Sequence, residues 1–275
     1  MNAPAHLPHR TATSENFPVA SWLIAPRHRA AILAFYRFAR TADDVADGSG
    51  SADAKLAGLE AMRATLAGEA TASPEALALR EVLDERGLTD VHGFDLLTAF
   101  RRDVTDPNVA SWDDLIGYCR ISAMPVGRFV LDVHGERAAT KPASDALCAA
   151  LQVINHLQDC GEDYRDLARV YIPADWLAEA GIEASALGAR STSPALRGVL
   201  DRMLDATDAL LRQSCEFAAQ ISDRRLACEV AVIQRLAESL SKRLRRQDPL
   251  AGPVKHHKLE AAGLGLAAIA RSLLR

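Results

Sequence analysis

The chain has 275 residues, 49% of them hydrophobic, and a formal net charge of −4 at pH 7. That length can bury a large core within one domain, and the negative charge argues against a general nucleic-acid-binding surface. Five cysteines, odd in number and set within helical patterns, predict buried reduced thiols in a cytosolic protein. Neither the period-two alternation of strands nor a long internal repeat occurs, so an all-α fold is expected.

The N-terminal part of the chain begins with a polar tail. Residues 1–14 lack the apolar stretch of a secretory signal and are predicted to be disordered. Residues 15–275 are expected to form one helical domain. A short helix is predicted over residues 16–23, followed by a long helix over residues 27–47, because Pro26 suits the first position of a helix.

The middle of the chain alternates helical patterns with Gly, Ser and Pro. Ser111 begins a capping sequence that opens a helix through Tyr118, and Pro125 is expected to kink or break that helix because it removes a backbone hydrogen bond. Asp103, near a helix end, is interpreted as a surface or capping residue. Further helices are predicted over residues 53–66, 74–85, 91–103, 173–177, 193–221, 223–246 and 256–275.

The stretch LQVINHLQDCGEDYRD carries a row of oxygen-bearing side chains. Gln152, Asn155, Asp159 and Asp163 fall within one face of an α-helix because they are three or four residues apart. Apolar residues beside them predict that this row lines a cavity next to a core. Gly161 costs roughly 1 kcal/mol relative to Ala inside a helix, so another segment is expected to pack closely there.

A second row lies about a hundred residues earlier in the chain. Tyr36, Arg40, Asp43 and Asp47 also share one helical face, with apolar residues packing nearby. For either row taken alone, a solvated helix surface is the alternative interpretation. Two such rows on long amphipathic helices favour a shared site.

The two rows together have the composition of a hard-cation site. Mg²⁺ prefers oxygen ligands and is usually held by one or two carboxylates together with substrate phosphates. Four carboxylates facing one cavity would repel by about 4 kcal/mol per close pair at an effective dielectric constant near 20. Divalent ions and a diphosphate between the rows would remove that cost. The predicted metal ligands are Asp43, Asp47, Asn155, Asp159 and Asp163.

Both rows resemble the two aspartate-rich motifs of the squalene and phytoene synthase superfamily. Residues 36–47, YRFARTADDVAD, are similar to the first motif, and residues 152–163, QVINHLQDCGED, are similar to the second. Ser122 and Pro125 depart from the segment that most squalene and phytoene synthases carry. The segments most similar to the hydroxysqualene synthase branch of bacterial hopanoid pathways are 15–21, 118–128 and 169–173.

This resemblance implies an isoprenoid synthase bundle whose two motifs face each other across a central apolar cavity. It implies that two or three Mg²⁺ ions bridge the diphosphate of a prenyl substrate. The catalytic carboxylates would be Asp43, Asp47, Asp159 and Asp163. The residues expected to bind substrate are Phe17, Tyr36, Arg40, Tyr118 and Gln152, although a core position is the alternative for Tyr118. The aromatic residues expected to line the pocket are Phe17, Phe35, Phe38 and Phe129.

The reaction that the resemblance implies converts presqualene diphosphate and water into hydroxysqualene and diphosphate. No glycine-rich dinucleotide fingerprint follows a strand, so NADPH is not expected. The alternatives are head-to-head condensation of two farnesyl diphosphates and a non-catalytic helical assembly protein, and the presence of every expected carboxylate and amide disfavours the second of these. His156 and Tyr171 are considered as general bases, with structural roles as the alternative.

The sequence contains no uninterrupted apolar run of about 18 residues, so no membrane span is predicted. A cytoplasmic protein is expected, with contacts to the inner membrane surface and to neighbouring pathway enzymes as further expectations. Residues 259–274 fit either a core helix or a helix on a bilayer surface. The basic segment 241–246 fits a solvated helix end or a lip for diphosphate or anionic lipid. Lys255 and Lys258 lie where the family often keeps a basic phosphate contact.

Overall fold

The computed structural model describes residues 24–273, apart from the side chains at 258, 259 and 270–273. The predicted tail at 1–14, the predicted helix at 16–23 and Phe17 lie outside this range. Between residues 24 and 273 the chain is helical, and its extended pairing is limited to one isolated parallel bridge between Asn108 and Val170. The all-α prediction is therefore confirmed.

The elements follow one another along the chain with short connections. The α-helices are α1 (Pro26–Asp47), α2 (Ala52–Leu66), α3 (Pro74–Arg86), α4 (Val91–Thr105), α5 (Trp112–Ser122), α6 (Met124–His134), α7 (Lys141–Leu167), α8 (Ala174–Glu179), α9 (Pro194–Gln213), α10 (Phe217–Gln220), α11 (Arg224–Leu244) and α12 (Lys258–Leu273). Two short 3₁₀ turns, η1 (Ala138–Thr140) and η2 (Ala184–Gly188), join them.

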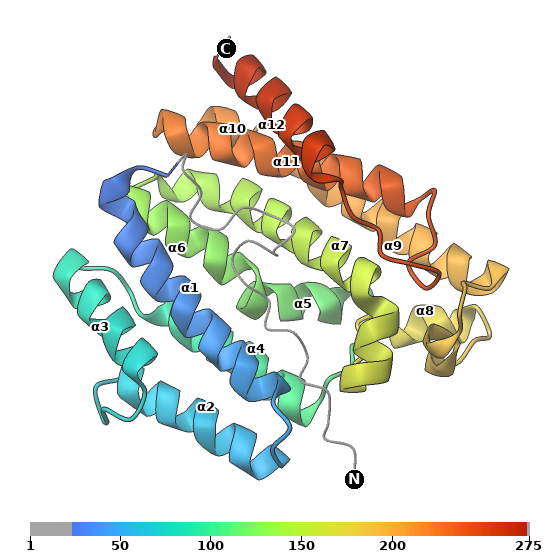
Figure 1. Ribbon diagram of the computed structural model, residues 1–275, viewed down its shortest axis with the longest axis horizontal. Helices are drawn as coiled ribbons and strands as arrows, with labels where there is room; N and C mark the ends of the chain where they lie inside the picture. The colour runs from blue at the N-terminus through green and yellow to red at the C-terminus, as the bar shows by residue number, and fades with distance from the viewer. Residues whose placement is uncertain (1–23, 274–275) are drawn as a thin grey trace.

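The helices form two groups around α1 and α7. Helix α1 packs against α2, α3 and α4, whereas α7 packs against α9 and α11. Helices α5 and α6 contact α7 from the other side, and α6 also contacts α1. In Figure 1, α1 and α7 run in the same general direction, with α5 and α6 between them, and their C-terminal ends lie toward the same side of the molecule. This arrangement brings the ends of both motif helices toward each other.

Side-chain caps explain where several helices begin. Ser51, Ser73 and Ser193 each accept a hydrogen bond from a backbone N–H in the first turn of the helix that follows. Ser111 does the same for Asp114, which confirms the predicted capping sequence. Such caps typically stabilise a helix by about 1 kcal/mol because they satisfy N–H groups that have no partner within the helix.

Pro125 ends one helix and starts the next. Helix α5 stops at Ser122 and α6 begins at Met124, so the predicted break is confirmed. Helix α6 then passes very close to α7. A Cβ at Gly127 would lie 2.5 Å from Cys148 Sγ and 2.6 Å from Ser144 Oγ, so only glycine allows this approach.

Two predictions in the second half of the chain were wrong. The helix predicted over 193–221 breaks at Ser214, which caps the end of α9. Ser214 is buried and donates a hydrogen bond to the Leu211 carbonyl, and its hydroxyl also meets the Gln234 amide oxygen at 2.8 Å. Such local bonds from serine compete with helix continuation. Cys215 is exposed, unlike the buried thiols that were predicted.

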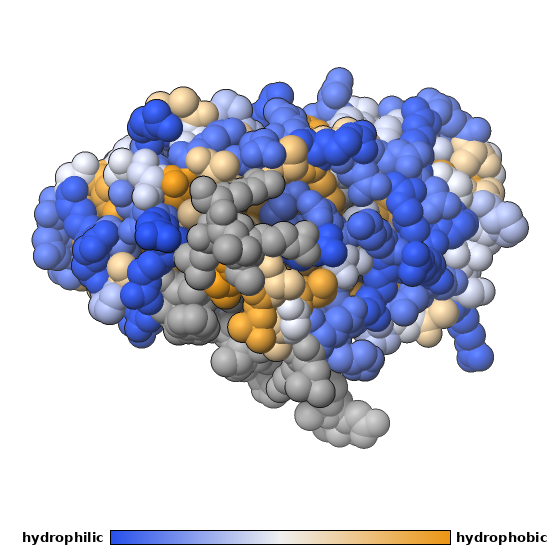
Figure 2. All heavy atoms as spheres, turned by 90° about the horizontal axis from the view of Figure 1, so that it is seen from above, coloured by the Kyte–Doolittle hydropathy of each residue, from blue (hydrophilic) through white to orange (hydrophobic). Residues whose placement is uncertain are grey.

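The hydrophobic core has one part around α7 and one around α1. Helix α12 packs on α11 through Ala261, Leu264 and Ala268, which favours the core interpretation of that tract, and Leu266 on the same helix is 70% exposed. The face seen in Figure 2 is mostly hydrophilic, with hydrophobic atoms gathered near its middle. No helix among residues 24–273 has the length and apolarity needed to cross a bilayer.

Candidate functional site

The two predicted rows are real structural features of α1 and α7. Every member of both rows is half-buried, whereas the neighbouring positions Phe35, Phe38, Val153 and Ile154 are fully buried in the core. Each row is therefore the border between a core-facing stripe and solvent, as the periodicity predicted. The row members are Tyr36, Arg40, Asp43 and Asp47 on α1 and Gln152, Asn155, Asp159 and Asp163 on α7.

Asp43 lies in an environment that disfavours its charge. Burial, together with the nearby Asp47 carboxylate, raises the pKa of its carboxyl to about 7. The Arg40 guanidinium, 2.8 Å from Asp43 and 2.6 Å from Asp44, opposes this effect but is shared between the two carboxylates. A multivalent cation beside Asp43 would therefore meet a carboxyl that gains from being neutralised.

Asp47, the last residue of α1, is paired with a residue from beyond α7. The Arg169 guanidinium lies 2.6 Å from Asp47 Oδ1, and the Arg169 side chain is only 9% exposed. Although the atoms are close, Asp47 Oδ1 receives no well-aligned hydrogen bond from any residue between 24 and 273. The contact is a close ion pair, and the half-buried Asp47 carboxylate keeps lone pairs that can bind a cation.

The end of α7 places Arg169. Ala168 adopts the left-handed conformation with φ 53°, and the Arg169 N–H donates to the Asp163 carbonyl at 3.0 Å. This is the geometry of a C-terminal helix cap. Val170 then pairs with the 107–109 segment through two backbone hydrogen bonds, Val170 N–H to Pro107 O and Val109 N–H to Val170 O. Asp163 and Arg169 are therefore held in fixed relation by the backbone.

Asp103 is a buried acceptor for two tyrosines, so its predicted surface or capping role was wrong. Tyr118 and Tyr171 each donate a hydroxyl hydrogen bond of 2.9 Å to its carboxylate. Burial raises the pKa of Asp103, and the Arg169 charge opposes that shift. Tyr118 is 4% exposed, which fits the core alternative, but its hydroxyl belongs to the polar network beside Asp47. Nothing in the sequence around Asp103 reveals these partners, because they come from α5 and from the segment after α7.

His156 extends the network toward the α7 row. Its ring stacks on Tyr171 with centroids 3.7 Å apart, and its Nε2 lies 3.2 Å from the Gln152 side-chain nitrogen. Burial lowers the pKa of His156 to about 3, so the ring is neutral near pH 7. Burial also raises the pKa of Tyr171, which donates its proton to Asp103. Both residues therefore fit structural roles better than roles as general bases.

These features fit a divalent cation at the carboxylate rows. The donor set of carboxylates with one amide matches the oxygen ligands that Mg²⁺ takes. Asp47 Oδ1 lacks a well-aligned partner among the described residues, and Asp43 gains from neutralisation. The residues that would hold the ion are the predicted ones, Asp43, Asp47, Asn155, Asp159 and Asp163. Among the described residues no three of these carboxylates bring oxygen atoms within 4.8 Å of one another, so an ion would have to draw the two rows closer together.

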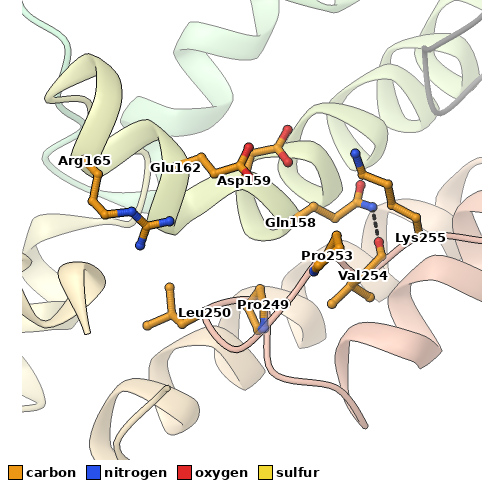
Figure 3. A pocket seen from close by; sticks show the side chains of 10 residues that line it. Gln158, Asp159, Glu162, Arg165, Pro249, Leu250, Pro253, Val254 and Lys255 are labelled. Atoms are coloured by element: carbon orange, nitrogen blue, oxygen red, sulfur yellow. Dashed lines mark hydrogen bonds between the residues drawn. The ribbon is translucent and has the colours of Figure 1, made fainter. Parts of the chain in front are cut away.

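A cavity of about 90 Å³ lies between α7 and the 249–255 segment. Figure 3 shows Asp159, Glu162 and Arg165 on its α7 side and Lys255 on the opposite segment. A Cβ at Gly161 would lie 2.8 Å from Leu250 Cδ2, which confirms the close packing predicted at this glycine. This cavity is small and has both charged and apolar residues in its lining, so the central apolar cavity stays a prediction.

The aromatic and basic residues have defined neighbours. Phe35 and Phe129 stack with centroids 4.1 Å apart, and Phe38 is fully buried in the core part around α1.

In the basic segment 241–246, Arg243 pairs with Glu260, and Arg245 pairs with Asp205 and Asp208. These pairs favour the interpretation as a helix end over an anion-binding lip.

Sequence comparisons place these features in context. The family model described as squalene/phytoene synthase matches residues 10–260. A hydroxysqualene synthase from Zymomonas mobilis is 52% identical, with the match covering 99% of this chain and 93% of the relative. A hydroxysqualene synthase from Rhodopseudomonas palustris is 50% identical over 97% of this chain and 91% of the relative.

A solved structure supports the same grouping. The crystal structure of a squalene synthase from Alicyclobacillus acidocaldarius matches with a TM-score of 0.74 and 32% sequence identity. The match covers 86% of this chain and 89% of that one. Similarity therefore extends over the whole helical domain and includes both aspartate rows.

Proposed function

Because the chain belongs to the squalene/phytoene synthase family, we propose that it converts presqualene diphosphate and water into hydroxysqualene and diphosphate. In this reaction the carbon–oxygen bond to diphosphate breaks with its electron pair leaving on the diphosphate. The resulting carbocation rearranges and takes up water, which loses one proton to give the alcohol. The electrons and atoms balance without a reductant.

The observation that carries this proposal is the identity of about half of all residues to two hydroxysqualene synthases over nearly the full chain. The structure adds a physical reason to keep the chemistry. Both aspartate rows are present and half-buried, and Arg169 links the end of one to the end of the other. A protein that had lost its chemistry would have no need to keep these mutually repelling carboxylates.

We further propose that Mg²⁺ is the metal ion held by the two rows. When bound, it would neutralise the diphosphate and so favour its departure. Arg40 would offer hydrogen bonds to phosphate oxygens once the ion replaces it at Asp43. Tyr36 and Gln152, on the same faces, are proposed to donate to the same group.

The aromatic rings around Asp103 are uncharged. Tyr118 and Tyr171 keep their protons and hold their rings through bonds to Asp103. His156, neutral because of burial, adds no positive charge beside the rows. Neutral rings are suited to stand near a carbocation, since an aromatic face attracts a cation and an imidazolium would repel it.

Head-to-head condensation of two farnesyl diphosphates is the second candidate. It is favoured by the similarity to a structure described as a squalene synthase. The 118–128 segment, with Ser122 and Pro125 where most squalene and phytoene synthases differ, favours the first candidate.

One product assay distinguishes these candidates. Purified protein with Mg²⁺ and presqualene diphosphate, without reductant, is expected to release hydroxysqualene. In water enriched in ¹⁸O the label should appear in its hydroxyl group. Efficient formation of presqualene diphosphate from farnesyl diphosphate would instead support the condensing enzyme. Folded, metal-loaded protein that turns over neither substrate would support a non-catalytic role.

A further inference from the structure

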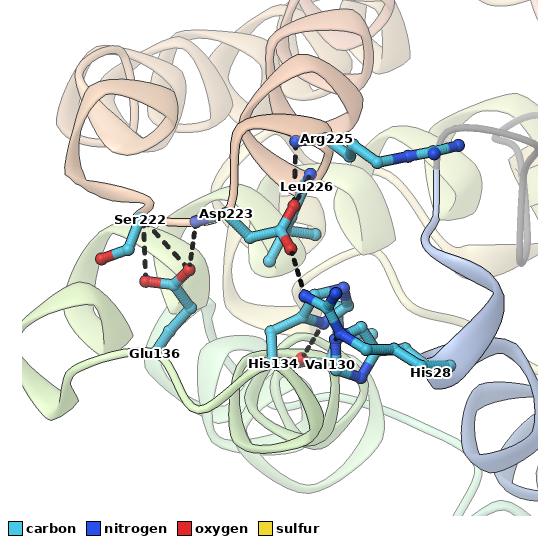
Figure 4. A network of polar contacts seen from close by, with 9 residues as sticks. His28, Val130, His134, Glu136, Ser222, Asp223, Arg225 and Leu226 are labelled. Atoms are coloured by element: carbon cyan, nitrogen blue, oxygen red, sulfur yellow. Dashed lines mark hydrogen bonds and ion pairs between the residues drawn. The ribbon is translucent and has the colours of Figure 1, made fainter.

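A cluster of nitrogen and oxygen ligands lies at the opposite end of α1 from the aspartate row. His28 comes from the first turn of α1, His134 is the last residue of α6, and Asp223 caps the start of α11. One ligand atom from each lies within 4.8 Å of the others. Figure 4 shows the three side chains converging from three separate elements.

Two buried ring nitrogens in this cluster lack a hydrogen-bond partner among the described residues. His28 is 8% exposed, and its Nδ1 is buried without a hydrogen-bond partner among residues 24–273. The Nε2 of His134 is likewise buried and unpartnered within that range. Leaving a buried polar atom without a partner costs about 1–3 kcal/mol. Two such atoms, on rings whose centroids lie 4.2 Å apart, suggest a ligand that satisfies both.

The surrounding bonds orient these groups as metal ligands are commonly oriented. His134 Nδ1 lies 2.8 Å from the Val130 carbonyl, which makes Nδ1 the donor and leaves the lone pair on Nε2. A backbone carbonyl on the far nitrogen is a frequent partner of metal-bound histidine. Asp223 accepts the Arg225 and Leu226 N–H groups at Oδ1, which leaves Oδ2 for an outside partner.

That partner is presently a cation. Arg27 Nη2 lies 3.3 Å from Asp223 Oδ2, and Arg27 Nε donates to His28 Nε2 at 2.9 Å. The Arg27 side chain is 71% exposed, so it can swing into solvent at little cost. Because Arg27 donates to His28 Nε2, the ring proton of His28 lies on Nδ1. Once Arg27 moves away, that proton can shift to Nε2, where it faces the space that Arg27 vacates, and the Nδ1 lone pair becomes available to a metal ion.

We propose that His28, His134 and Asp223 form a binding site for a divalent transition-metal ion of the Zn²⁺ type. Two imidazoles and one carboxylate are a usual three-residue set for Zn²⁺, with water as the fourth ligand. Zn–ligand bonds of about 2.0–2.1 Å place ligand atoms about 3.3 Å apart, so closure needs a side-chain adjustment of about 1.5 Å or less. The ion would join the α1 group of helices to the α7 group through α11.

The test is a Zn²⁺ titration of metal-free, full-length protein against a chromophoric chelator, in excess Mg²⁺ to occupy the aspartate rows. One Zn²⁺ is expected to bind, and the midpoint of thermal unfolding should rise by about 3 °C or more. Co²⁺ in the same site should give the intense visible absorption of a tetrahedral complex.

Matched variants locate the ion. His134→Gln and Asp223→Asn should weaken Zn²⁺ binding at least about tenfold, and Asn at 223 keeps the ability to cap α11. His256→Gln, which alters a histidine bonded to Ser239 outside the cluster, should leave affinity unchanged. The double variant Asp43→Asn/Asp159→Asn should also bind Zn²⁺ as before. Unchanged affinity in both cluster variants, loss of binding in the aspartate variant, or no Zn²⁺ binding to the unaltered protein would overturn the proposal.

Discussion

The Arg169 guanidinium lies 2.6 Å from the Asp47 carboxylate, so a residue that follows α7 neutralises the last residue of α1. The same arginine acts electrostatically on Asp43, Asp103 and His156. Its charge therefore influences both aspartate-bearing helices and the tyrosine network between them. Removing it should affect the fold as well as the site.

Arg169→Gln is expected to destabilise the protein by about 2–3 kcal/mol. Breaking a fully buried ion pair costs about 3–5 kcal/mol, and the cost is smaller here because the Asp47 side chain is 33% exposed. Urea unfolding of both single variants and the double variant Asp47→Asn/Arg169→Gln measures the coupling. If the changes in unfolding free energy of the two single variants add up to that of the double variant, the two residues do not stabilise each other.

Alanine at Asp43, Asp47, Asp159 or Asp163 should lower kcat/KM at least about 100-fold, equivalent to roughly 2.7 kcal/mol of transition-state stabilisation. Circular dichroism should remain that of a folded helical protein, because these half-buried side chains lie at the border of the core and not inside it. Asp47→Ala should be the least stable of the four, since it leaves the buried Arg169 without its ion-pair partner. Treatment of the unaltered protein with EDTA should abolish turnover, and added Mg²⁺ should restore it.

Asp166→Ala is the matched control for these variants, since Asp166 is an exposed acidic residue in the last turn of the same helix α7. Its activity should stay within about twofold of the unaltered protein. Full activity after EDTA treatment without added metal would show that the carboxylates serve some other purpose.

His156 should make the protein sensitive to acid. Its pKa falls from an ordinary 6.5 to about 3 on folding, so the unfolded chain binds more protons between these values. Stability from this group is full above about pH 6.5 and is lost as the pH falls toward 3. Between pH 7 and pH 5 the loss should be about 2 kcal/mol. Urea unfolding in EDTA should show a smaller decrease for His156→Gln, and equal decreases would contradict the burial of a neutral ring.

Gly127 and Gly117 should respond oppositely to alanine. Gly127→Ala forces a methyl group against Cys148 and Ser144, so a loss of about 1–3 kcal/mol is expected. Gly117 has no atom within 4 Å of an added Cβ, so Gly117→Ala should stabilise α5 by up to about 1 kcal/mol. Thermal unfolding compares the two directly. A neutral Gly127→Ala would mean that α6 and α7 can separate easily.

The sequence predicted what depends on local spacing and missed what depends on distant partners. The rows containing Asp43 and Asp159 were predictable because helical periodicity places their members on one face. Asp103 was misread, since its two tyrosine partners are contributed by other parts of the chain. The role of Arg169 was missed for the same reason, as its ion pair joins residues more than a hundred positions apart. The break at Ser214 is accompanied by a contact with Gln234, which no local pattern around Ser214 reveals.

The helix cap at Ala168 restricts how the molecule can open. The Arg169 N–H donates to the Asp163 carbonyl, and the Arg169 side chain forms an ion pair with Asp47. These two contacts hold the C-terminal ends of α1 and α7 together. A long hydrocarbon that entered between these helices could not separate their C-terminal ends without breaking the Arg169–Asp47 ion pair. We therefore expect the motions that admit substrate to occur elsewhere, for example in the 249–255 segment, which borders α7 without forming a helix.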